Sequence, residues 1–126
     1  MDIEHAIPIF DALSQETRLR TFRLLVQAGQ QGLPAGALSE KLGTPQNTLS
    51  FHLSHLSNAG IIQSRREGRS IIYSASYDEI HRLISFMVKD CCSEEFASIH
   101  EDKGAGCSII ELSDCCAPVQ MQKEAL

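Results

Sequence analysis

The 126-residue sequence lacks any apolar run near the roughly 18 residues that a membrane-spanning helix needs. Its start, Met1-Asp2-Ile3-Glu4-His5, has two acids and no basic cluster, which argues against a secretory signal and predicts a cytoplasmic protein without a membrane partner. Aromatic residues are scarce at 6%, but apolar residues at 43% and charged residues at 21% are ordinary for globular proteins. This composition excludes collagen-like and mostly disordered chains, and the length predicts one small core.

Signatures of catalysis are also missing. The sequence has no glycine-rich phosphate loop and no nucleophile elbow, and no histidine has a cysteine partner close to it in sequence. We therefore expect the protein not to be an enzyme.

An excess of basic residues is absent as well, since the net charge is −5. The acidity is local, however: residues 91–126 hold two basic and seven acidic residues, whereas residues 1–90 hold nine of each. Within the first part, Arg65, Arg66 and Arg69 face only Glu67 as an opposing charge, a basic cluster of the kind that contacts phosphates. The overall charge therefore does not exclude a nucleic-acid partner.

Apolar periodicity and helix-ending glycines predict four helices in the first 60 residues. They are expected over 3–13, about 15–28, 34–42, and from Thr44-Pro45 to Gly60. Ser14 is the expected N-cap of the second helix. That helix should bury a stripe of Leu19, Phe22 and Val26, with Leu25 beside them, and expose Arg18, Arg20 and Arg23. The fourth should bury Leu49, Leu53 and Leu56.

Two strand-like runs, 61–66 and 70–76, flank Glu67-Gly68-Arg69, and this pattern predicts a β-hairpin with a basic tip. A fifth helix, capped by Asp78, carries an apolar stripe that continues to Cys91. Two short helices joined by about two residues and followed by a hairpin indicate a mainly α winged helix-turn-helix with the order α-α-α-α-β-β-α. We assign it to residues 1–92 and expect residues 93–126 to be a flexible, acidic, cysteine-rich tail.

Such a fold places its fourth helix in the major groove of double-stranded DNA. Amide and hydroxyl side chains that suit base edges or phosphates open this helix, at Gln46, Asn47, Thr48 and Ser50. Of His52 and His55, one is expected to pack within the domain and the other, assigned as His52, to face the DNA backbone. The wing arginines Arg65, Arg66 and Arg69 fit phosphate or minor-groove contacts.

The chain resembles the ArsR/SmtB family of metalloregulatory repressors over about residues 5–90. The likeness is carried by Asp11-Ala12-Leu13-Ser14-Gln15-Glu16-Thr17-Arg18-Leu19-Arg20, by 38–43, by 46–56, by Ala59-Gly60-Ile61-Ile62 and by 65–69 through to Tyr73. The resemblance implies a homodimer, held mainly by the first and last helices, that represses its own operon and leaves DNA when an inducer binds. Two recognition helices would then read a palindromic operator.

All five cysteines fall after residue 90, at Cys91, Cys92, Cys107, Cys115 and Cys116. Arsenic-sensing family members with a Cys-x-Cys pair carry it before the recognition helix, but residues 33–37 hold no thiol here. The sequence instead is similar to the branch with a vicinal pair at the end of the last helix and another cysteine in the tail. Because trivalent arsenic and antimony prefer three thiolates, we expect Cys91, Cys92 and Cys107 to bind them. Cys115 and Cys116 are possible additional ligands.

Three alternatives remain open at the level of sequence. The thiols suit a redox or persulfide sensor, in which Cys91 or Cys92 pairs with a tail cysteine. A zinc or cadmium sensor would rely on Asp78, His81 and the distant His100, which is a weak ligand set. A metal-buffering protein would use the tail and bind DNA weakly and without sequence preference.

Overall fold

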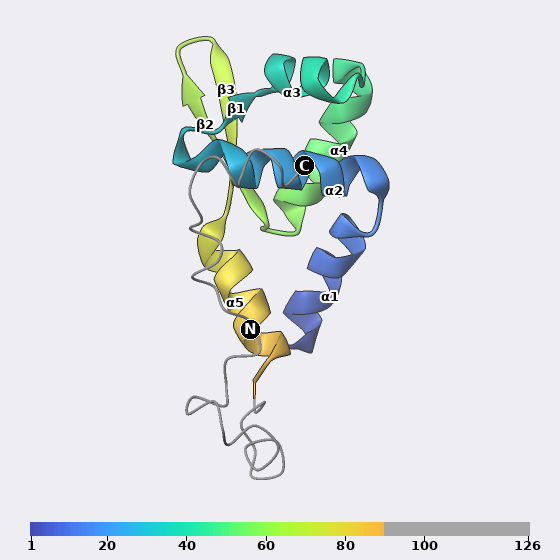
Figure 1. The fold of residues 1–126 in the computed structure, drawn as a ribbon, viewed down its shortest axis with the longest axis vertical. Helices are drawn as coiled ribbons and strands as arrows, with labels where there is room; N and C mark the ends of the chain where they lie inside the picture. Colours follow the sequence, from blue (N-terminus) through green and yellow to red (C-terminus); the bar gives the residue numbers. More distant parts are fainter. Residues whose placement is uncertain (90–126) are drawn as a thin grey trace, which may run out of the picture. The chain divides into compact units, whose positions relative to one another are not determined.

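The computed structural model describes residues 1–89, which form five α-helices and a small antiparallel sheet (Figure 1). The elements are α1 (Ile3–Leu13), α2 (Glu16–Ala28), a 3₁₀ turn η1 (Gly29–Gln31), β1 (Leu33–Pro34), α3 (Ala35–Leu42), α4 (Gln46–Asn58), β2 (Ile62–Glu67), β3 (Ser70–Ala75) and α5 (Tyr77–Met87). The predicted boundary at residue 92, the tail 93–126 and all five cysteines lie outside the described residues.

The hairpin and the helix order are confirmed. Strands β2 and β3 pair from Ile62 opposite Ala75 to Glu67 opposite Ser70. Gly68 has a φ of 62° in the turn, which a residue with a Cβ adopts only at a cost. The sequence did not reveal β1, which pairs with β3 and makes the strand order β1-β3-β2. The prediction that Pro34 begins the third helix is therefore wrong, because Pro34 belongs to this short edge strand.

The core is made by one face of every helix together with the base of the hairpin. Its buried apolar residues are Ala6, Ile9, Ala12, Leu25, Leu38, Leu49, Leu53, Leu56, Ile61, Ile62, Ala75 and Leu83. The three leucines of α4 are at most 2% exposed, and burying each contributes roughly 1.5–3 kcal/mol. This anchoring fixes which face of α4 turns outward.

The start of α2 differs from the prediction. Ser14 ends α1, where its Oγ donates to the Asp11 carbonyl at 2.8 Å, so Gln15 caps α2 and accepts from the Arg18 amide at 2.9 Å. Only these two residues separate the helices, and Ser14 is used by the first of them. The fifth helix also begins two residues earlier than an Asp78 cap predicts, at Tyr77, with Asp78 inside its first turn.

The buried face of α2 was predicted correctly in part: Phe22 and Val26 pack against the core, but Leu19 does not. Leu19 is 46% exposed, whereas Thr21 and Leu25 are fully buried. Thr21 enters the core because its hydroxyl donates to the Thr17 carbonyl at 2.7 Å, which satisfies its only side-chain donor. Arg18 was expected to be exposed but is half-buried on the same side, where its Nε donates to the Ala12 carbonyl at 2.7 Å.

None of the helices within residues 1–89 has the length and apolar character that spanning a bilayer requires.

Candidate nucleic-acid interface

The polar face of α4 is the first part of the candidate interface. Gln46, Asn47, Thr48 and Ser50 are all exposed: Asn47, Thr48 and Ser50 lie away from the buried leucine stripe, and Gln46 is the first residue of the helix. Two of them also fix the start of the helix: Asn47 Oδ1 accepts from the Thr48 amide at 3.0 Å, and Ser50 Oγ donates to the Asn47 carbonyl at 2.8 Å. Each of these groups has further hydrogen-bonding capacity for an external partner.

The outer surface of α4 carries no acidic residue between Gln46 and Asn58. Helix α3 packs against α4. The contact is close at Gly36 of α3, where an added Cβ would lie 3.7 Å from Gln46 Nε2. A short helix packed across the start of an exposed polar helix is the helix-turn-helix arrangement. Helix α4 itself therefore adds no negative charge that would repel phosphates.

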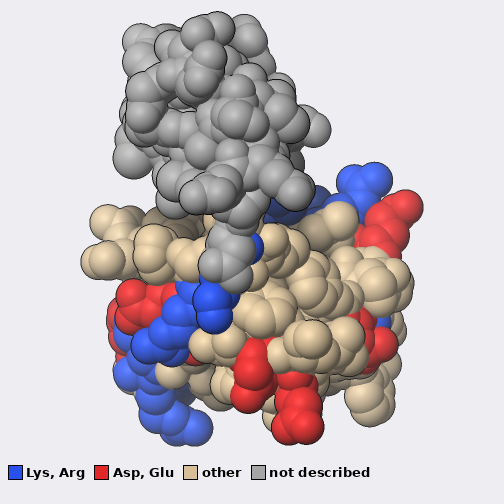
Figure 2. All heavy atoms as spheres, turned by 90° about the horizontal axis from the view of Figure 1, so that it is seen from below, with Lys and Arg blue, Asp and Glu red and all other residues tan. Residues whose placement is uncertain are grey.

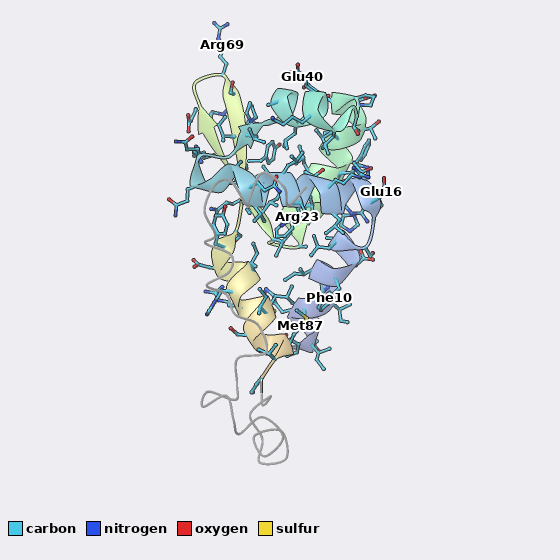
Figure 3. The ribbon with its side chains drawn as sticks, viewed as in Figure 1. Phe10, Glu16, Arg23, Glu40, Arg69 and Met87 are labelled. Carbon is cyan, nitrogen blue, oxygen red and sulfur yellow. The ribbon has the colours of Figure 1, made fainter. Side chains whose placement is uncertain are left out.

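The wing arginines are not equivalent. Arg65 is held by the domain itself: its Nη1 and Nη2 donate to the carbonyls of Gln30 and Gln31 at 3.0 and 2.7 Å, and its Nε to Glu67. Within residues 1–89, Arg66 and Arg69 make no hydrogen bond or ion pair. Figure 3 shows Arg69 projecting outward from the hairpin tip. Arg65 thus fastens the wing to η1, while the other two present free guanidinium groups.

The two histidines of α4 both have partners inside the domain. His52 is half-buried, with Nδ1 3.4 Å from Arg18 Nη1, and His55 Nε2 lies 3.0 Å from Asp11 Oδ2. Sequence reasoning expected only one of them to pack inward. The pair links α4 to the end of α1 and the start of α2. Among the described residues, His, Cys, Asp and Glu side chains do not gather in threes that could hold a metal ion.

The surroundings of His52 make its protonation unfavourable. Burial, then the Arg18 guanidinium, then His55 lower its pKa from the ordinary 6.5. Because the unfolded chain takes up this proton more readily than the folded one, the contribution of His52 to stability is complete above pH 6.5 and declines as the pH falls below that value.

We expect an NMR titration to find the His52 pKa below 6.5, and Arg18→Met to raise it part of the way back, since burial remains. Arg20→Met is the matched control, because Arg20 lies on the same helix but pairs with Glu16 on the surface at 3.3 Å. It should leave the His52 pKa where it is. A His52 pKa at or above 6.5 in the unmodified chain contradicts this description of the site.

Comparison with known proteins supports this interpretation of the surface. A family model described as a helix-turn-helix domain matches residues 13–65. An uncharacterized HTH-type transcriptional regulator of Methanocaldococcus jannaschii is 33% identical over 84 residues, which cover 67% of this chain and 92% of that protein. The transcriptional activator HlyU of Vibrio cholerae is 29% identical over 87 residues, which cover 69% of this chain and 78% of that protein. Both relatives are transcriptional regulators, in agreement with the prediction of a regulator and not an enzyme.

Solved structures confirm the fold. An ArsR-like transcriptional regulator from Rhodococcus sp. RHA1 matches with a TM-score of 0.64 and 24% identity, over 81% of this chain and 93% of that one. The homodimeric winged helix-turn-helix DNA-binding domain of a possible ArsR-family regulator from Mycobacterium bovis matches with a TM-score of 0.58 and 24% identity, over 76% and 85% of the two chains. The predicted winged helix-turn-helix is therefore correct.

Proposed function

The chain belongs to the family of HTH-type transcriptional regulators, and on this premise we propose that it represses an arsenic-resistance operon as a homodimer on a palindromic operator. Trivalent arsenic or antimony would release it by binding cysteine thiolates that follow α5. The assignment of this inducer rests on the position of the thiols: none lies in residues 1–90, and five lie beyond.

DNA binding draws on the two exposed surfaces. The start of α4 offers Gln46, Asn47 and Thr48 to base edges in the major groove. At the hairpin, Arg66 and Arg69 reach phosphates beside the groove. Arg65 supports this contact from within, because its bonds to the Gln30 and Gln31 carbonyls hold the wing in place. His52, whose pKa is lowered by burial and by Arg18, is the candidate backbone contact on the same helix.

The dimer is supported by apolar residues on the outer face of α1. Ile3, Ile7 and Phe10 are 67%, 59% and 41% exposed and recur at intervals of four and three residues, so they share one helix face. Figure 3 places Phe10 at the opposite end of the domain from Arg69. Viewed from that end, a broad area free of Asp, Glu, Lys and Arg is bordered by charged side chains (Figure 2). A contact there leaves both recognition helices open to DNA.

The inducer chemistry follows from the thiol set. Three cysteine thiols condense with arsenite, each losing its proton to a departing hydroxide as water, and the arsenic stays trivalent with three sulfur bonds. Adjacent residues on a helix point about 100° apart, so Cys91 and Cys92 meet one ion only if the helix end unwinds. Cys107 supplies the third sulfur, with Cys115 or Cys116 as substitutes. Binding is thereby coupled to the dimer helix.

The test is fluorescence anisotropy of the reduced chain on DNA from upstream of its own gene, titrated with arsenite, antimonite, methylarsenite, zinc and cadmium. We expect the trivalent ions to weaken DNA binding by about 5- to 150-fold, the usual range of such coupling. Cys91→Ser or Cys92→Ser should abolish release and leave DNA affinity unchanged.

Other outcomes assign a different inducer. Release by zinc or cadmium alone would overturn the thiolate assignment and favour a carboxylate and histidine site. Release only by an oxidant, reversed by dithiothreitol, would identify a redox sensor. Weak binding without sequence preference would overturn the operator assignment itself.

A further inference from the structure

The most exposed large apolar side chain among the described residues is Phe51, at 78%. It lies in the middle of α4, two residues from both Leu49 and Leu53. Two residues correspond to about 200° around a helix, so the ring points away from the core stripe. Its neighbours at three and four residues along the helix are polar: Asn47, Thr48, Ser54 and His55.

An exposed phenyl ring in a polar row needs an explanation that capping and packing do not supply. The ring covers no core residue, since the core leucines occupy the other side of α4. Burying its surface against an apolar group would be favourable, in proportion to the area covered. Phe51 was not predicted as a DNA contact, because most groups on base edges are recognised by hydrogen-bonding side chains, and Phe51 has none.

We propose that Phe51 is a specificity-determining residue that packs against the 5-methyl group of a thymine in the operator. This inference rests on the proposed DNA-binding function. Base edges in the major groove present hydrogen-bond donors and acceptors, and the thymine 5-methyl is the one apolar group beside them. A ring at the centre of the outer face of α4, between the amide of Asn47 and the hydroxyl of Ser54, stands where that methyl group would be read.

The experiment removes the methyl group and leaves the base pair intact. The full-length reduced chain is first used to select binding sites from a randomised duplex pool, and each thymine of the selected site is then replaced by deoxyuridine. Burying a methylene-sized group contributes about 0.8 kcal/mol, which corresponds to about a fourfold change in affinity. We expect this loss when the contacted thymine is replaced in one half-site, and about a fifteenfold loss when it is replaced in both half-sites.

The penalty should depend on the ring. In Phe51→Ala the loss caused by deoxyuridine should disappear, and in Phe51→Leu it should be partly retained. Leu19→Ala is the matched control, because Leu19 is an exposed apolar residue on α2 at 46% and should keep the full penalty.

A site that tolerates deoxyuridine at every thymine would overturn the proposal, as would a penalty that persists in Phe51→Ala. A change of oligomeric state in Phe51→Ala would show that the ring covers another protein chain and overturn it too. Failure to enrich any site would overturn the DNA-binding function on which the proposal rests, and so is distinguishable from failure of the methyl contact.

Discussion

Gly32→Ala is expected to destabilise the domain by roughly 2–6 kcal/mol. Gly32 has a φ of 69° and a ψ of −168°, a backbone conformation that is open almost only to glycine. A Cβ there would also overlap the Tyr73 carbonyl oxygen and come within 3.0 Å of Ile72 Cγ2. Since Leu33 pairs with Tyr73, relieving the overlap would separate β1 from β3. Urea unfolding followed by circular dichroism at fixed protein concentration measures the loss.

Gly29→Ala separates the two causes. Gly29 has nearly the same conformation, with φ 74° and ψ −163°, but nothing lies within 4 Å of its hypothetical Cβ. It should lose only the backbone penalty of roughly 1–3 kcal/mol. The difference in unfolding free energy between the two variants then measures the cost of the steric overlap with Tyr73 on β3. Equal losses would mean that the contact with Tyr73 contributes nothing.

The helices were predictable because local rules decide them. The leucine stripe of α4, for example, needs only the 3.6-residue period, and the glycine at 43 ends α3 in a left-handed conformation. The strand β1 was not predictable, because two residues show no periodicity and the strand exists only by pairing with β3, some forty residues away. The interior position of Thr21 was missed because the acceptor that permits it is a backbone carbonyl, which a sequence does not display.

The candidate interface was predictable in its location but not in its internal bonds. That Asn47 and Thr48 are exposed follows from the opposite face being apolar, and Gln46 is exposed because it opens the helix. Nothing local distinguishes Arg65 from Arg66, yet only the first reaches the carbonyls of η1. Alternation along a strand sends these neighbours to opposite faces, and the tertiary fold decides which face has acceptors.

Ile7→Glu is expected to convert the proposed dimer to monomers and to lower affinity for the proposed two-half-site operator by at least about 100-fold. A carboxylate placed at the centre of the α1 face would be buried without a partner, which costs several kcal/mol per ion. The affinity should fall further than the loss of one contact would suggest, because a dimer presents its second recognition helix at a high effective concentration. This linkage raises affinity by a factor of about 10²–10⁴, which separate monomers lose. Sedimentation velocity reports the oligomeric state, and anisotropy the binding.

Ile71→Glu is the matched control, the same substitution at a residue that is 41% exposed on β3. It should leave the oligomeric state unchanged, so a general effect of added charge on assembly is excluded. Because Ile71 pairs with Arg66 of the wing, this variant is a control for sedimentation and not for DNA affinity. A single half-site duplex distinguishes dimer loss from damage to α4, because Ile7→Glu should bind it as the unmodified protomer does. If Ile7→Glu remained dimeric, the apolar face of α1 would not form the interface.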